Sequence, residues 1–130
     1  MIDCSEIVYE SLSSLGADVY PDSAPQKANL PYVIYRVIRG SSPQDLSQSQ
    51  TVHQQVVNFE VHANQRKQGA KILESISKTF KALRGEIADY FVQSFYPQND
   101  YAHRRVSERD GTGTFRHIVT YSYRVTFNEA

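Results

Sequence analysis

The sequence has a single cysteine, no long hydrophobic run and no excess of either charge. With only Cys4, no intrachain disulfide can form, which favours folding in a reducing cytosol. No apolar run approaches the ~20 residues that a transmembrane helix needs. The first six residues lack the basic region and apolar stretch of a signal peptide. We therefore expect no membrane partner.

The charge balance limits the class of partner. The chain has 14 lysines and arginines and 14 aspartates and glutamates, so its formal net charge is zero. A dedicated nucleic-acid-binding protein usually has a basic excess, whereas a chain without net charge does little to keep its own copies apart. At 130 residues and 40% hydrophobic composition, residues 1–130 fit one domain with a buried core.

Catalytic and metal-binding patterns are missing. There is no HExxH, CxxC or GxSxG motif, and no histidine is near Cys4 in the sequence. His62 and His117 could meet across a sheet, with Glu60 on the side of His62, but single histidines on strands are more often surface or satisfied interior residues. None of the four histidines has metal-ligand spacing: His53, His62, His103 and His117. The sequence therefore predicts no catalytic, cofactor or metal site.

The stretch from Phe115 to Phe127 has the clearest pattern. Its odd positions are mostly aromatic or β-branched, and its even positions are polar except for Ile118. Because successive side chains of a strand point to opposite faces, this alternation predicts a strand with one apolar and one polar face. At about 3.3 Å per residue it would span roughly 40 Å, long enough for the spine of a sheet.

Two helices and several strands are expected around this spine. The apolar periodicities predict helices over Asp3–Leu15 and Gln65–Arg84. The strands are expected at Val19–Tyr20, Tyr32–Arg39, Thr51–Ala63 and Ile87–Tyr96, with Arg104–Glu108 leading into the turn Asp110–Gly113. The fold class is α+β, an antiparallel or mixed sheet of about five to six strands with two helices packed on it.

Local signals set the expected helix ends. Asp3 with Glu6 resembles a capping box at the start of the first helix, and Gly16 is a natural stop. Asn64 can cap the second helix, and Gly85 can follow its end. The apolar stripe of the second helix is Ala70, Leu73, Ile76, Phe80 and Leu83.

Two further features point to contacts with other proteins. The strand Tyr32–Ile38 is apolar on both faces and needs cover on both. The polar loop Gly40–Gln50 has only one aliphatic residue, Leu46, so we expect it to be mobile in the isolated subunit. The basic face of the second helix, with Arg104 and Arg105, could touch nucleic acid, although a solvated face is the simpler interpretation.

The order of these segments resembles the tail completion, or tail terminator, proteins of long-tailed bacteriophages and prophages. The resemblance covers nearly the whole chain, and its motifs are structural and not catalytic. The carrying residues are Met1–Asp3, Val19–Pro21, Leu30–Arg36, Asn58–Ala63 and the helix through Leu83. The chain departs from the family in having Ser47 after the Asp45–Leu46 pair.

The resemblance implies a structural protein without a cofactor or a reaction. Such proteins form a ring, typically of six, on the head-proximal end of the tail tube, where they stop tube polymerisation and join the tail to the head. The implied partners are further copies of the chain, the tail tube protein and the head connector, with room for passing contact with DNA in the lumen. The protein would assemble in the host cytoplasm and reside in the virion.

By the same analogy, the polar loop would contact the tube or a neighbouring subunit and become ordered on docking. The expected contact residues are Ser41, Ser42, Asp45, Leu46, Ser47 and Gln48, together with Arg104 and Arg105. Two alternatives remain open at this point. The chain could be a head-closure, connector or tail-tube protein of the same virion, or a small α+β enzyme or ligand-binding module with a concave pocket.

Overall fold

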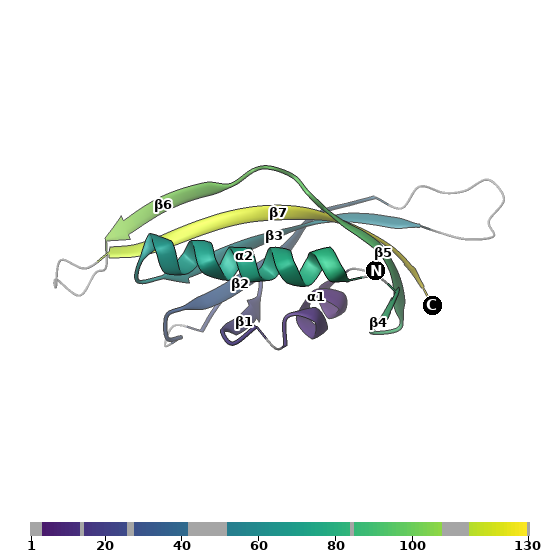
Figure 1. Ribbon diagram of the computed structural model, residues 1–130, viewed down its shortest axis with the longest axis horizontal. Helices are drawn as coiled ribbons and strands as arrows, with labels where there is room; N and C mark the ends of the chain where they lie inside the picture. Colours follow the sequence, from purple (N-terminus) through teal and green to yellow (C-terminus); the bar gives the residue numbers. More distant parts are fainter. Residues whose placement is uncertain are drawn as a thin grey trace.

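The described part of the protein is a sheet of seven strands with two helices (Figure 1). The computed structural model describes residues 4–13, 15–25, 28–41, 52–83, 85–107 and 115–129. The elements in chain order are α1 (Ser5–Ser11), β1 (Asp18–Pro21), β2 (Tyr32–Ser41), β3 (His53–Ala63), α2 (Arg66–Ala82), β4 (Gly85–Ile87), β5 (Tyr90–Pro97), β6 (Ala102–Ser107) and β7 (Phe115–Glu129).

The predicted long strand is confirmed and extends to Glu129 as β7. One edge of β7 pairs with β3 from Ala63–His117 to His53–Phe127 without a register shift. Its other edge is shared by β5 and β6, which pair with opposite halves of the strand (Figure 1). The strand is therefore the spine of the sheet, as the alternation of its side chains indicated.

The sheet is mixed, with the strand order β1-β2-β3-β7-β5-β4 and β6 beside β7. Among the strands of the described residues, only β1 and β2 pair in parallel. The sheet has seven strands because β4, which the sequence analysis missed, forms a hairpin with β5. Ala88 and Asp89 make the turn with φ values of 50° and 65°, a left-handed conformation that Ala rarely adopts. No glycine marks this turn, so the expected single strand Ile87–Tyr96 was wrong at its start.

β5 and β6 are two parts of one antiparallel partner of β7. Gln98–Tyr101 interrupt them, and the backbone of β7 is satisfied there by other groups. The N–H of Ser122 donates to Oδ1 of Asp100 at 2.7 Å, and the N–H of Gln98 donates to the carbonyl of Ser122 at 3.0 Å. The segment between the expected strands Ile87–Tyr96 and Arg104–Glu108 is therefore shorter than predicted, because β5 extends to Pro97 and β6 begins at Ala102. The register Ser107–Phe115 confirms that the chain turns back here, although the predicted turn Asp110–Gly113 lies outside the described residues.

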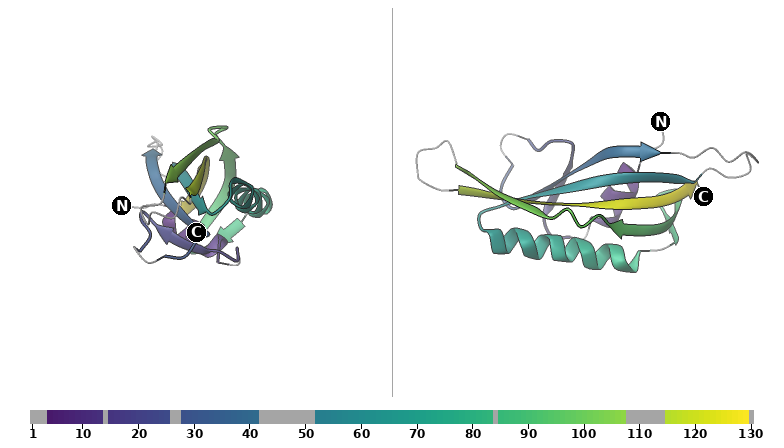
Figure 2. Two further views of the ribbon diagram at one scale, coloured as in Figure 1. Left: turned by 90° about the vertical axis from the view of Figure 1, so that its left-hand side faces the viewer. Right: turned by 90° about the horizontal axis from the view of Figure 1, so that it is seen from above.

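α2 packs on the face of the sheet formed by the odd residues of β3 and β7. It buries Gly69, Leu73, Ile76 and Phe80, so the predicted stripe is confirmed at its three middle positions. Ala70 and Leu83, also predicted in the stripe, are half-buried. The helix begins after Gln65 without a side-chain cap, so the expected cap at Asn64 was wrong. Figure 2 shows α2 running along the length of the sheet.

α1 is shorter than expected. Ile7, Val8 and Leu12 are buried, but the helix ends at Ser11. Gly16 is left-handed with φ 84°, several residues beyond the helix, so it does not stop it. The proposed cap Asp3 lies outside the described residues, and the N–H of Cys4 at the helix start donates to Oε1 of Gln55 at 2.7 Å. Within the described ranges no helix is long and apolar enough to span a membrane.

Aromatic rings fill the space between α2 and the sheet. Phe80 stacks on Phe95 with ring centroids 4.0 Å apart, and it also meets Phe59 and Tyr123.

The cover expected on both faces of β2 holds only for the first half of that strand. Tyr32–Tyr35 are buried, whereas Ile38 is 57% exposed.

Gly69 lets α2 approach β7 closely. A Cβ at this position would lie 2.9 Å from Cγ2 of Val119. We therefore expect Gly69→Ala to lower the free energy of unfolding, because overpacking costs about 1–3 kcal/mol and outweighs a gain of about 1 kcal/mol in helix propensity. Denaturant unfolding of the single and double variants measures this. On a Val119→Ala background, adding Gly69→Ala should be neutral or stabilising, and a stabilised Gly69→Ala single variant would contradict the close approach.

Candidate interaction surfaces

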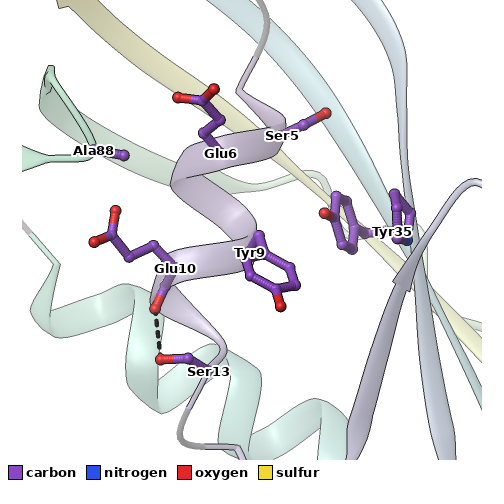
Figure 3. Close-up of a pocket in the computed structure, with 8 residues that line it drawn as sticks. Ser5, Glu6, Tyr9, Glu10, Ser13, Tyr35 and Ala88 are labelled. Carbon is purple, nitrogen blue, oxygen red and sulfur yellow. Dashed lines mark hydrogen bonds between the residues drawn. The ribbon is translucent and has the colours of Figure 1, made fainter.

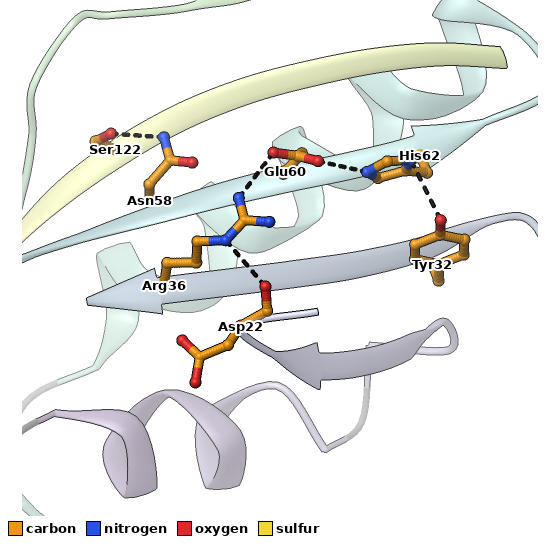
Figure 4. Close-up of polar contacts among 7 residues, drawn as sticks. All are labelled: Asp22, Tyr32, Arg36, Asn58, Glu60, His62 and Ser122. Atoms are coloured by element: carbon orange, nitrogen blue, oxygen red, sulfur yellow. Dashed lines mark hydrogen bonds and ion pairs between the residues drawn. The ribbon is translucent and has the colours of Figure 1, made fainter. Parts of the chain in front are cut away.

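A chain of polar contacts crosses the face of the sheet that is turned away from the helices (Figure 4). Nη1 of Arg36 on β2 lies 3.0 Å from Oε2 of Glu60 on β3, and the other carboxylate oxygen lies 2.6 Å from Nε2 of His62. Nδ1 of His62 lies 3.3 Å from the hydroxyl of Tyr32. Nε of Arg36 donates to the carbonyl of Asp22 at 2.9 Å, which attaches the segment after β1. The network therefore joins three segments of the chain.

Two further contacts extend this network to β7. Nη1 of Arg116 donates to the hydroxyl of Tyr32 at 2.9 Å. Nδ2 of Asn58 donates to Oγ of Ser122 at 2.9 Å. These side chains meet because the registers align even positions of β3 with even positions of β7 on one face.

The environment of Glu60 keeps it ionised. The hydrogen bond with His62 is the largest cause that lowers the pKa of Glu60 from 4.5 to about 2; burial opposes the shift and Arg36 adds to it. Both carboxylate oxygens are already occupied, so Glu60 is unsuited to act as a general base. No cluster of three or more metal-ligand side chains exists in the described part of the chain. The contacts of Glu60 with Arg36 and His62 therefore hold β2 and β3 together, and we call this group of residues the Glu60 clamp.

The metal site considered from the sequence would need His62, His117 and Glu60 on one face of the sheet, and the structure does not bring all three together. Glu60 and His62 do share one face, as expected. His117, however, pairs with Ala63 in the register and so lies on the opposite face, where its Nδ1 is 3.0 Å from Nε2 of His103. Burial is the first cause that lowers the pKa of His103, followed by electrostatic repulsion from Arg66, His117 and Arg105.

The two arginines predicted at contacts lie on β6 and are exposed. The register aligns Arg104 with Ile118 and Arg105 with His117, so their side chains belong to opposite faces of the sheet. The guanidinium of Arg105 lies over the ring of Phe115, 4.2 Å from its centroid. The pair therefore does not form one basic patch.

Of the other predicted contact residues, Ser41 is the one that the structure describes, and it lies at the end of the sheet opposite to Arg104 and Arg105. Ser41 is the last residue of β2, and Ser42, Asp45, Leu46, Ser47 and Gln48 lie outside the described residues. Ser41 aligns with Gln54 of β3. Arg105 aligns with His117 of β7, which in turn aligns with Ala63 of β3. Gln54 and Ala63 are nine residues apart on β3. At about 3.3 Å per residue these two regions are roughly 30 Å apart. Figure 1 shows the end of β2 and the end of β6 at opposite ends of the molecule.

A groove beside α1 was not foreseen from the sequence. Its volume is about 550 Å³, and its lining includes Glu6, Tyr9, Glu10, Tyr35 and Ala88. Tyr9 is 60% exposed. Figure 3 shows the side chains of Glu6 and Glu10 on the side of Ala88 and the ring of Tyr9 toward Tyr35. The only signal in the sequence is the exposed side of the first helix, because the other walls come from distant segments.

Removing the charge of Glu60 tests the clamp. The ionised carboxylate of Glu60 stabilises the folded protein above pH 4.5. This stabilisation is lost as the pH falls through about 2, because the pKa of Glu60 is lowered in the folded state. Glu60→Gln should therefore lower the free energy of unfolding at neutral pH by about 1–3 kcal/mol and flatten its decline in acid.

Denaturant unfolding across this pH range measures the effect. Glu74→Gln is the matched control, since Glu74 is 66% exposed and its ion pair with Lys78, at 3.6 Å, lies on the surface. The effect of this substitution should stay within about 0.5 kcal/mol. An unchanged pH profile for Glu60→Gln would contradict the clamp.

Comparison with known proteins adds the family. The model of the family described as tail completion protein gp17 matches residues 10–126. No curated relative matches the sequence. The fold is similar to that of a chain from the virion of a native gene transfer agent particle, with a TM-score of 0.59 and 19% identity over 93% of this chain and 91% of that chain. The chain belongs to the tail completion protein gp17 family.

Proposed function

We propose that this structural phage protein forms a ring at the head-proximal end of the tail tube, terminates tube polymerisation and joins the tail to the head. The observation that carries the proposal is the family match over residues 10–126. The similarity to the fold of a virion chain is consistent with it. The proposed site of action is the virion, after assembly in the host cytoplasm.

The two ends of the sheet suit a protein that bridges two partners. The end with Ser41 leads into the predicted contact loop, and the end with Arg104 and Arg105 lies roughly 30 Å away along the strands. In the proposed ring, one of these ends contacts the tail tube protein and the other contacts the head connector. The loop is proposed to contact the tube or a neighbouring copy as it docks.

A cyclic ring requires heterologous contacts, in which one patch of a subunit meets a different patch of the next. The chain has no net charge, so long-range repulsion does not oppose the approach of copies. We expect six copies in the ring, as the resemblance implies. Polar strand contacts such as those of Glu60 keep each subunit rigid while its outer surfaces bind.

Deletion of the gene tests this proposal. Electron microscopy of lysates should show overlong or irregular tails that are separate from filled heads, because nothing stops the tube or links it to the connector. Supplying the wild-type gene should return joined particles with tails of uniform length.

Normal joined virions in the deletion lysate would overturn the proposal. Leaking heads beside tails of normal length would also overturn it, because that result places the protein on the head side of the joint.

A further inference from the structure

The charges of this neutral chain are segregated on its surface. Residues 4–25, which hold α1 and β1, carry four carboxylates and no lysine or arginine. All four are exposed: Glu6, Glu10, Asp18 and Asp22. α2 carries five basic residues and one acidic residue over Arg66–Ala82. One molecule thus presents an acidic region and a basic region.

The basic region is a straight row, which we term the lysine stripe. Lys67, Lys71, Lys78 and Lys81 recur at three, four and seven residues and are all exposed. This spacing places them on one side of the helix, opposite the buried row that includes Leu73 and Ile76. Lys78 lies 3.6 Å from Glu74, whereas Lys67 and Lys71 have no acidic partner among the residues described.

Each helix has a pair of like charges whose mutual repulsion the other helix could relieve. Glu6 and Glu10 are four residues apart on α1, and Lys67 and Lys71 are four residues apart on α2. Like charges at this spacing destabilise a helix by about 0.2–0.5 kcal/mol per pair. Neither carboxylate has a basic partner in the described ranges. The two pairs have equal spacing and opposite sign, so they match when the helices lie side by side.

The groove beside α1 also suits lysine side chains in shape. Its walls include Tyr9, Pro21, Tyr35 and Ala88, with the two carboxylates at its acidic side (Figure 3). A lysine buries its four-carbon stem along apolar surface while its ammonium stays in water or beside a carboxylate. The exposed ring of Tyr9 offers such a surface. An acidic helix or a nucleic acid would instead meet repulsion from Glu6 and Glu10.

We infer that the groove beside α1 binds a second copy of this chain through Lys67 and Lys71 of its lysine stripe. The contact is heterologous, so each subunit keeps a free stripe and a free groove for the next copies, and the chain of contacts can close into a ring. In the end-on view of Figure 2, α2 lies at the right of the molecule and the α1–β1 segment lies below and to the left, so the two surfaces occupy different parts of one subunit. This inference rests on the self-assembly proposed above and names the surfaces that carry it.

Charge reversal with rescue tests the contact. The variants Glu6→Lys/Glu10→Lys and Lys67→Glu/Lys71→Glu should each weaken self-association by on the order of tenfold or more, because two attractive pairs become repulsive. Combining all four substitutions should restore association. Combining Glu6→Lys/Glu10→Lys with Lys78→Glu/Lys81→Glu is the matched control and should not restore it. Sedimentation and electron microscopy of rings on purified tails provide the measurements.

The outcomes separate this contact from the wider proposal. If both reversal variants form normal rings, or if the combined variant is no better than either alone, the contact is overturned while the terminator role stands. Circular dichroism checks that each variant is folded; if reversal unfolds α1, Glu6→Gln/Glu10→Gln replaces it and should weaken association less. A wild-type chain that never self-associates, even on tails, overturns the contact and the ring together.

Carbodiimide crosslinking of the wild-type protein gives an independent test. This reagent joins a carboxylate to an ammonium group only where the two are in contact. Rings assembled from a mixture of ¹⁴N-labelled and ¹⁵N-labelled copies should yield mixed-isotope peptides that link α1 to the segment with Lys67 and Lys71. Links only within single-isotope pairs, or none between these segments, would overturn the contact.

Discussion

The pairing of β3 with β7 is the constraint on which the rest of the structure depends. The antiparallel register runs from His53 to Ala63 without a shift. It places Val57, Phe59 and Val61 under the helices, and it places Glu60 on the opposite face with Arg36 and His62. A slip by one residue would exchange the two faces and bury the polar network under α2. The clamp around Glu60 and the aromatic core around Phe80 therefore reinforce the same register from opposite faces.

This sheet separates the surfaces that the proposed assembly would use. The strands hold the end at Ser41 roughly 30 Å from the end at Arg105, because backbone pairing along β3 fixes the distance. The helices lie on one face, where their outer sides remain available. A subunit built in this way can contact a neighbour through its helices while its two ends meet different partners.

The sequence predicted the elements whose side-chain period is long and regular. β7, β3 and α2 were foreseen because their apolar residues repeat at two or at three to four positions over many residues. The hairpin of β4 was missed because its turn uses Ala88 and Asp89 in place of glycine. Gly69 was missed because its importance lies in its distance from Val119, which no local pattern encodes.

The predicted contact residues show the same limit. Arg104 and Arg105 are exposed as a contact would require, but their strand position sends them to opposite faces. The groove beside α1 joins segments that are far apart in the sequence, so only the fold brings Tyr9 and Tyr35 together.

The most direct test of the whole account is cryo-electron microscopy of joined particles that carry a labelled copy of this chain. The account predicts one ring of label per particle, at the joint between head and tail tube. Label along the tube, at its distal tip or absent from the particle would contradict it.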